Sequence, residues 1–329
     1  MNDVVSLSNL TSPNTHLFIS PHYDDIALSC GGTAALVAEA GKDAVVALLF
    51  GDHPDPEQPM TPFANYMHAE WGMSAEEVIA GRRAEEAESA RILGVRDVFL
   101  PFRDAIYRGD NYLNDEQLFG TPRGTDLDLP ERVVAAIAAE GFRAPGSRAY
   151  APLASGFHVD HQLGFQAGVL LASYGWDVWF YEDLPYSLLE GRVPDRLARA
   201  GEELDVAGLV GVSSVWTKKI DAIMAYPSQL KVIFESYVGP EAAAKRSTRS
   251  WRPTVKTWEM AEMPNGFGSL PVDEDELDAP VDLIDSNSAA SASDWRSFDW
   301  GKQIRRPAIW GLFVLTAIVL AVQIWLLYL

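Results

Sequence analysis

The chain has very little cysteine and is short of positive charge. Cys30 is the only cysteine among 329 residues, so no disulfide can form within the chain. This fits a reducing compartment, and Cys30 itself is expected to be a small buried side chain rather than a nucleophile. The 26 Lys and Arg residues stand against 46 Asp and Glu residues, which gives a formal charge of −20. Phosphate groups would be repelled, so nucleic acid and an anionic membrane surface are excluded as partners.

The signatures of several common enzyme classes are also missing. A dinucleotide-binding enzyme would carry G-x-G-x-x-G after a strand, and the stretch at 29–33 (SCGGT) does not supply it. A serine hydrolase would carry a G-x-S-x-G turn, which does not occur. Metal phosphohydrolases typically use two metals and more carboxylates than one short cluster offers. Residues 1–14 are polar and lack the basic and apolar regions of a signal peptide.

Apolar runs alternate with helical patterns over most of the chain. Runs of the kind found in buried parallel strands occur at residues 17–19, 43–51, 96–101, 147–153 and 177–181. Helical patterns occur after the glycine pair at 31–32 and at 74–93, 129–140, 162–173, 216–225 and 228–237. This alternation predicts an α/β fold with a Rossmann-like, mostly parallel sheet flanked by helices.

Two long connections interrupt this pattern. Residues 52–66 are rich in proline and are predicted to form a loop, in which His53 is expected to be solvated. The polar residues 105–127 are predicted to form a rim or lid. The aromatic residues that are frequent beyond 215, Trp216 and Tyr226 among them, fit core positions better than a sugar-binding groove.

Three polar side chains follow the first predicted strand at once. His22, Asp24 and Asp25 come directly after Pro21. An imidazole and two carboxylates are costly to cluster at a strand-to-helix turn unless a cation is present. The pattern suits a zinc site with one position left open for water. The competing interpretation is that His22 caps the turn and one of the aspartates caps the following helix.

A second polar turn follows the strand predicted at 147–153. It carries His158, Asp160 and His161 just after Gly156. Only six histidines occur in the chain, and three of them fall in these two turns. Together the turns supply two histidines and one carboxylate, which is a complete set of protein ligands for a catalytic zinc ion.

The paired turns resemble the PIG-L/LmbE family of zinc-dependent de-N-acetylases. That family opens with a motif close to A-H-P-D-D-E before a glycine pair and carries a distal H-x-D-H motif. In this chain the first motif corresponds to 21–26 (PHYDDI), with the glycine pair at 31–32. The second motif corresponds to 158–161 (HVDH). The similarity covers residues 14–260 and includes 82–85, 93–95, Asp104 and 181–186. Tyr23 and Ile26 stand where the family usually has Pro and Glu, and neither position is a metal ligand in the family pattern.

The resemblance implies a division of roles among these residues. His22, Asp25 and His161 would bind Zn²⁺, and Asp24 would act as general base towards a water on the fourth position. His158 would donate to the oxyanion of the tetrahedral intermediate, and Asp160 would hold an imidazole in the correct tautomer. Some relatives have a tyrosine two residues before this histidine, where the present chain has Gly156.

Two further residues are expected near the substrate. Asp104 follows the strand predicted at 96–101, at the sheet edge where open α/β sheets bind ligands. Arg82 lies on the helix predicted at 74–93, whose start carries a Ser74–Glu77 capping box and whose end is set by Gly94. The resemblance places Arg82 near the substrate pocket, whereas spacing alone also permits an exposed ion pair with Glu85.

The C-terminal region differs in character from the rest. Residues 271–300 contain nine acidic residues and one arginine, which is typical of a disordered linker. Residues 308–329 contain no charged side chain and as a helix would extend about 33 Å, enough to cross a bilayer. Lys302, Arg305 and Arg306 precede this stretch, and the positive-inside rule then places the catalytic domain in the cytoplasm.

The sequence therefore predicts a deacetylase domain at 1–268, an acidic linker at 269–301 and a single transmembrane anchor at 302–329. The expected protein is a zinc-dependent hydrolase that removes an acetyl group from an N-acetylated sugar or glycoconjugate, and the anchor suggests a lipid-linked one. It would be tail-anchored at the cytoplasmic face of the cell membrane. The alternative is a membrane-tethered carbohydrate-binding or scaffold module with a non-catalytic site. The oligomeric state cannot be read from the sequence.

Overall fold

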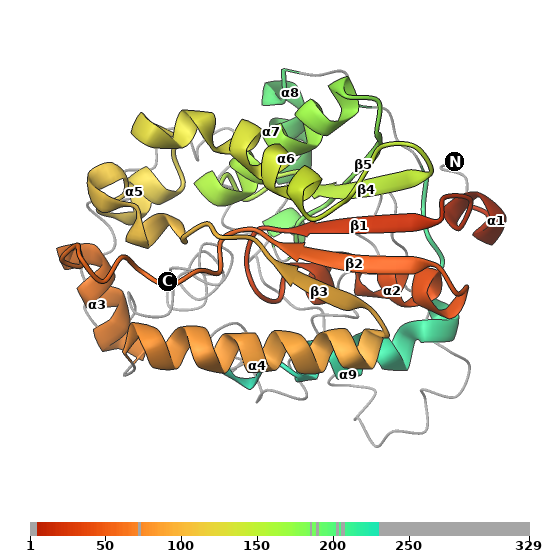
Figure 1. Ribbon diagram of the computed structural model, residues 1–329, viewed down its shortest axis with the longest axis horizontal. Helices are drawn as coiled ribbons and strands as arrows, with labels where there is room; N and C mark the ends of the chain where they lie inside the picture. The colour runs from red at the N-terminus through yellow and green to blue at the C-terminus, as the bar shows by residue number, and fades with distance from the viewer. Residues whose placement is uncertain are drawn as a thin grey trace, which may run out of the picture.

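A computed structural model describes residues 5–71, 74–184, 186–188, 191–201, 204 and 208–229. Their centre is a five-stranded sheet in which every neighbouring pair is parallel, in the order β3-β2-β1-β4-β5 (Figure 1). The strands are β1 (Thr15–Ser20), β2 (Asp43–Leu48), β3 (Arg96–Phe99), β4 (Ser147–Pro152) and β5 (Asp177–Tyr181). The predicted parallel α/β fold is confirmed, and each strand lies where its apolar run was found.

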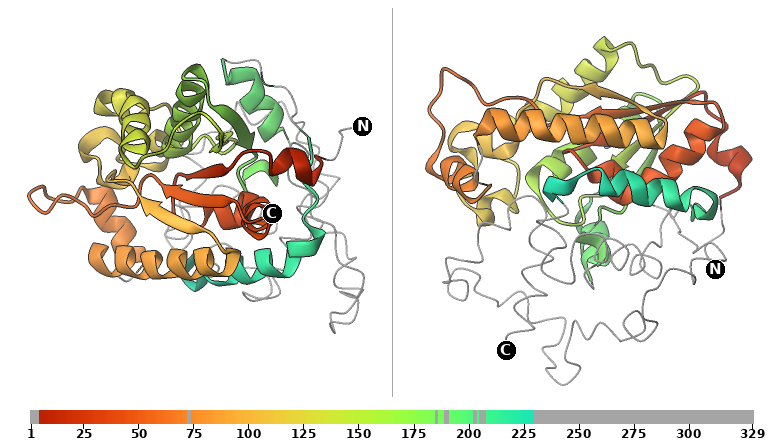
Figure 2. Two further views of the ribbon diagram at one scale, coloured as in Figure 1. Left: turned by 45° about the vertical axis from the view of Figure 1, so that its right-hand side comes forward. Right: turned by 90° about the horizontal axis from the view of Figure 1, so that it is seen from below.

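Helices cover both faces of the sheet (Figures 1 and 2). Packed on one face are α2 (Asp25–Glu39), α4 (Ala75–Leu93) and α9 (Trp216–Met224), and on the other α6 (Leu129–Ala139) and α7 (Val159–Ser173). Alternate strand residues enter the two cores: Phe18 and Val46 face the first, and Leu17 and Val45 face the second. Trp216 and Tyr226 are buried in the first core, as predicted.

Shorter elements complete the described part. The remaining α-helices are α1 (Leu7–Leu10), α3 (Pro62–Trp71), α5 (Asp115–Leu118) and α8 (Arg192–Arg199). Short 3₁₀ turns occur at Ala105–Tyr107, Gly109–Asn111, Gly124–Asp128, Tyr186–Leu188 and Ser213–Val215. Helices α3 and α5 lie at the end of the sheet towards which the strands run (Figure 1).

The boundaries of α4 follow from local sequence. The Ser74 side chain accepts a hydrogen bond from the Glu77 backbone N–H, and the Glu77 carboxylate accepts one from the Ser74 backbone, which is the predicted capping box. Gly94 ends the helix with a φ of 80°, a left-handed conformation that glycine adopts without a steric penalty.

Three sequence predictions about local structure are wrong. Helix α2 begins at Asp25 rather than at the glycine pair, with only Cys30 departing from helical angles. Helix α7 begins at Val159, so Asp160 and His161 lie in its first turn. The loop predicted at 52–66 becomes helical at Pro62, although His53 is exposed in its first part as expected. The first turns of α2 and α7 contact each other through Asp25 and His161, which propensity alone does not predict. The start of α3 has a local cap, because Thr61 Oγ1 accepts a hydrogen bond from the Ala64 backbone N–H.

The segment 105–127 is a packed layer rather than an open rim. Its side chains Ile106, Tyr112 and Leu118 are buried in a third apolar cluster with Met67 of α3 and Val159 of α7. The burial of these apolar side chains holds the segment against the ends of the strands.

Part of the predicted organisation lies outside the described residues. This applies to most of the helix expected at 228–237, to the acidic linker and to the apolar stretch 308–329. Of the helices that the structure describes, none combines the length and apolar character that a bilayer crossing needs.

The contact between Gly51 and Tyr23 yields a prediction about stability. A Cβ atom at Gly51 would lie 2.8 Å from the Tyr23 hydroxyl oxygen, which donates a hydrogen bond to the Gly51 carbonyl. We expect Gly51→Ala to lower the free energy of unfolding by about 1–3 kcal/mol, the usual cost of overpacking. Gly81→Ala is the matched control, because a Cβ there meets no atom within 4 Å and should stabilise α4 by about 0.5–1 kcal/mol. Thermal and denaturant unfolding measure both, and equal effects of the two substitutions would contradict the prediction.

Candidate active site and metal centre

The two polar turns meet at one end of the sheet. Strands β1 and β4 are parallel neighbours, and the chain leaves β1 towards β2 on its other side. The carboxyl ends of β1 and β4 are therefore the switch point of the sheet, the crevice at which open α/β sheets bind ligands. His22 follows β1, and His158, Asp160 and His161 follow β4. All four side chains are buried.

The backbone at this crevice is strained. Among the described residues other than glycine, positive φ angles occur at Asp24 (86°), Ala154 (64°) and Phe157 (62°), and all three belong to these two turns. Such conformations cost free energy for residues with a Cβ and are concentrated at functional sites.

The three residues expected to bind metal are brought together. The Asp25 Oδ2 atom lies 3.6 Å from His22 Nδ1 and 3.5 Å from His161 Nε2. The same oxygen accepts a hydrogen bond of 2.8 Å from the His22 backbone N–H, which fixes the carboxylate. One carboxylate oxygen therefore stands between two imidazole nitrogens from two different loops.

Two other carboxylates orient these imidazole rings. His22 Nε2 donates to Asp160 at 3.0 Å, and His161 Nδ1 donates to Asp183 at 2.7 Å. The other nitrogen of each ring, Nδ1 of His22 and Nε2 of His161, therefore faces Asp25. Metal-binding histidines in proteins are usually held by this kind of carboxylate contact on the nitrogen that does not bind the metal.

The site has the donors that a cation would need. His161 Nε2 is buried and has no hydrogen-bond partner among the described residues. In two triads the ligand atoms all lie within 4.8 Å of one another: His22 with His158 and His161, and His22 with Asp104 and Asp160. Asp25 belongs to neither triad, but its Oδ2 atom lies within 3.6 Å of a nitrogen of His22 and of His161. Burial would lower the pKa of His161, but the charges of Asp25 and Asp183 raise it to about 9. A concentration of negative charge around imidazole nitrogens fits a bound divalent metal.

Asp24 lies beside this cluster with one oxygen unused. Its Oδ2 atom is buried and unpartnered in the described structure, and Oδ1 lies 3.9 Å from Arg82 Nη2. Burial raises the pKa of the carboxyl well above its usual range, and the charge of Arg82 opposes that change. Asp24 occupies the N-cap position of α2 but makes no side-chain capping bond, which contradicts the capping interpretation for this residue.

His158 presents a nitrogen to the crevice. Its Nδ1 accepts a hydrogen bond from the Asp160 backbone N–H at 3.2 Å, so its ring proton is on Nε2. That Nε2 is buried and unpartnered within the described residues. Burial and the neighbouring His22 hold the pKa of His158 well below its usual value, which keeps the ring neutral. The Asp160 carboxylate contacts the ring of His22 rather than that of His158, so the imidazole it positions is His22.

The two residues expected to bind substrate also lie at the site. Asp104 Oδ2 is 3.8 Å from His22 Nε2. Arg82 is buried rather than exposed, donates to the Tyr23 carbonyl at 3.2 Å and has an unpartnered Nε within the described structure. Glu85 bonds to Ser228 instead, so the alternative of an exposed Arg82–Glu85 pair is wrong.

Three residues of the site were not given roles by the sequence. Asp183 accepts hydrogen bonds from His161 Nδ1 and from the Ser155 backbone N–H. In the sequence, the only indication of its role was that it lies in 181–186, a stretch that resembles the family. Glu86 accepts from the Asp24 backbone N–H and from Tyr226, and burial raises its pKa to about 7. Arg108 contacts Asp160, and no motif marks it.

Comparison with known proteins shows which family this chain is similar to. The family model described as PIG-L, GlcNAc-PI de-N-acetylase, matches residues 17–171. A protein of Niallia circulans named 2'-N-acetylparomamine deacetylase is 30% identical over 246 residues, covering 70% of this chain and 84% of that protein. A protein of the same name from Streptomyces fradiae is 32% identical over 225 residues, covering 65% and 72%. A crystal structure of a deacetylase of the teicoplanin biosynthesis pathway has a TM-score of 0.54 and is 26% identical, covering 67% and 86%.

The arrangement predicts about one metal ion per chain, bound through His161. We expect His161→Ala to lose most of this metal, because a catalytic site has only three protein ligands. His53→Ala is the control, since His53 is exposed in a loop. Elemental analysis of the purified full-length proteins measures the metal content. Full retention of metal in His161→Ala would contradict the assignment of this ligand.

Proposed function

Because the chain belongs to the PIG-L family of de-N-acetylases, we propose that it is a zinc-dependent hydrolase that removes an acetyl group from an N-acetylated sugar or glycoconjugate. One observation carries this proposal. Asp24 Oδ2, His158 Nε2 and His161 Nε2 have no hydrogen-bond partner in the part of the chain that the structure describes, and all three belong to the two turns that meet at this crevice. An acceptor, a donor and a free metal ligand are the three elements that hydrolysis of an amide needs.

We assign the metal to His22, Asp25 and His161. When bound there, a zinc ion would supply a Lewis acid for the amide carbonyl and would make a water molecule more acidic. The identity of the metal is part of the proposal, and its support is the mixture of imidazole and carboxylate ligands.

The protein's own side chains divide the proton transfer and the stabilisation of the oxyanion. Asp24 takes the proton from the attacking water, because its Oδ2 atom has no partner among the described residues, and passes this proton to the leaving amine nitrogen as the C–N bond breaks. Burial raises the pKa of the Asp24 carboxyl, which makes it a stronger base. His158 donates a hydrogen bond from its Nε2–H group to the amide oxygen as negative charge develops on that oxygen. Arg82 lies beside Asp24 and Asp104 lies beside His22, and both are assigned to the substrate.

Asp24 and the metal can be tested separately. Asp24→Asn should retain the metal but lose turnover of an N-acetylglucosamine derivative by about 10²–10⁴-fold, because only the proton acceptor is removed. Asp110→Asn, a change to an exposed acid near the site, should leave both unchanged. Released acetate and metal content are measured on the same samples. Loss of metal in Asp24→Asn would show that Asp24 and Asp25 share or exchange their roles, and a metal-bound wild type without turnover on any N-acetylated sugar would favour a binding module.

The substrate class rests on the relatives. Two of them are named for deacetylation of 2'-N-acetylparomamine, and a structural relative belongs to teicoplanin biosynthesis. These names support an N-acetylated sugar or glycoconjugate for the present chain. A lipid-linked substrate is a narrower proposal that depends on membrane attachment.

We propose that residues 308–329 anchor the protein in the cell membrane, with the catalytic domain in the cytoplasm. The support is the uncharged 22-residue stretch and the three basic residues that precede it: Lys302, Arg305 and Arg306.

Removing residues 301–329 tests the anchor. The described site residues all lie before residue 230, so we expect the truncated protein to be released from membranes and to hydrolyse a small water-soluble acetamide as fast as the full chain. Turnover of a lipid-linked substrate should fall, because tethering raises the effective concentration at the bilayer. Paired assays on both substrates measure this, and protease protection in intact cells locates the domain. An externally accessible domain would contradict the proposed topology.

A further inference from the structure

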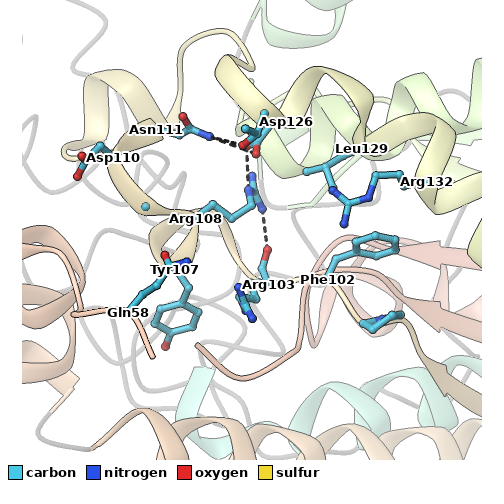
Figure 3. Close-up of a pocket in the computed structure, with 13 residues that line it drawn as sticks. Gln58, Phe102, Arg103, Tyr107, Arg108, Asp110, Asn111, Asp126, Leu129 and Arg132 are labelled. Carbon is cyan, nitrogen blue, oxygen red and sulfur yellow. Dashed lines mark hydrogen bonds and ion pairs between the residues drawn. The ribbon is translucent and has the colours of Figure 1, made fainter. Parts of the chain in front are cut away.

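Arg108 lines a cavity of about 470 Å³ (Figure 3) and also contacts Asp160 of the candidate active site. Its Nε donates to Asp126 at 2.8 Å, its Nη1 to the Arg103 carbonyl at 2.7 Å, and its Nη2 to Asp160 at 2.5 Å. The guanidinium also lies over the rings of Phe50 and Tyr112, with centroid distances of 5.0 and 5.4 Å. Three of its nitrogens therefore have fixed partners, and two aromatic rings hold the guanidinium in place.

Arg108 occupies one oxygen of the Asp160 carboxylate. The other oxygen accepts from the Ala105 backbone N–H at 3.1 Å and from His22 Nε2 at 3.0 Å. Rotation of this carboxylate would break a charge-assisted bond to Arg108, so Asp160 has one orientation. The orientation of Asp160 in turn fixes the ring of His22.

Asp126 completes a chain of three charged side chains. It is buried, accepts from Arg108 and lies 3.3 Å from the Asn111 amide nitrogen. A guanidinium between two carboxylates has a planar set of donors that an ammonium group cannot reproduce, so arginine is required by geometry as well as by charge. The chain runs from Asp126 through Arg108 and Asp160 to His22.

We propose that Arg108, braced by Asp126, is a positioning residue that holds Asp160 against His22 and thereby orients the imidazole that binds the metal. The inference rests on the proposed metal site. Arg108 and Asp126 make no contact with the ligand atoms, so their effect passes through Asp160 and His22. Loss of such a supporting partner typically lowers metal affinity by about 10–100-fold.

The experiment measures metal affinity of the full-length protein with a competing chelator dye, using Zn²⁺ as the probe. We expect Arg108→Met to weaken zinc binding by about 10–100-fold and to lower kcat with little change in KM. Arg108→Lys should recover part of the affinity, because the charge is kept and the fork geometry is lost. Asp126→Asn should give an intermediate loss. With Co²⁺ in place of Zn²⁺, the visible absorption spectrum of Arg108→Met should change, because the ligand geometry around the metal changes.

Arg132→Met is the matched control. Arg132 lines the same cavity, lies over the Phe102 ring and pairs with the exposed Asp128 at 3.8 Å. Its substitution should leave zinc affinity, kcat and the Co²⁺ spectrum unchanged. If Arg132→Met weakens zinc binding as much as Arg108→Met does, the loss comes from removing any positive charge from the cavity, and the proposal is overturned.

The outcomes separate this inference from the proposed function. A wild type that binds no metal overturns the metal site and this inference with it. A wild type that binds zinc, together with an Arg108→Met variant that binds zinc equally well and only melts at a lower temperature, overturns the inference alone and leaves the proposed function standing. If Arg108→Met does not fold, wild-type zinc affinity in both Arg108→Lys and Asp126→Asn overturns it.

Discussion

The parallel pairing of β1 with β4 is the constraint on which the site depends. Thr15 pairs with Ser147 and Phe18 with Tyr150, so the two strands end side by side and release their loops at the same edge. Because β2 lies on the other side of β1, the connection from β1 through α2 to β2 leads away from β4. Two turns separated by about 130 residues therefore become one site. Neither turn alone supplies the metal ligands. The turn after β1 has a single histidine, and the carboxylate of the turn after β4, Asp160, is already held by His22 and Arg108.

The second physical feature is the amount of charge buried in a small volume. Asp24, Asp25, Asp104, Asp160 and Asp183 are all buried at this edge, and burial of a carboxylate without a counter-charge is unfavourable. Arg82, near Asp24, and Arg108, paired with Asp160, offset part of this cost. Among the described residues, neither arginine pairs with Asp25, whose carboxylate lies between His22 and His161. A metal ion at that place would complete the balance of charge.

The same network separates the roles of chemically identical side chains. Three histidines meet here, yet their ring nitrogens are used differently. A carboxylate holds Nε2 of His22, another holds Nδ1 of His161, and a backbone N–H occupies Nδ1 of His158. The first two rings keep a lone pair for a cation, whereas the third keeps a proton for a substrate oxygen. Hydrogen bonds outside the immediate site thus decide which ring acts as ligand and which as donor.

The sequence by itself determined the sheet, the two turns and the residues that they carry. Short uninterrupted apolar runs such as 44–48 are typical of strands buried on both faces, and the rare histidines marked the turns, so both were readable without coordinates. The helix starts at Asp25 and Val159 were not readable, because the first turn of each is stabilised by contacts with the other turn. Arg108 and Asp183 were assigned their contacts only by tertiary structure. Their partners lie 52 and 22 residues away in the chain, and no local pattern specifies which buried carboxylate or imidazole a distant side chain will meet.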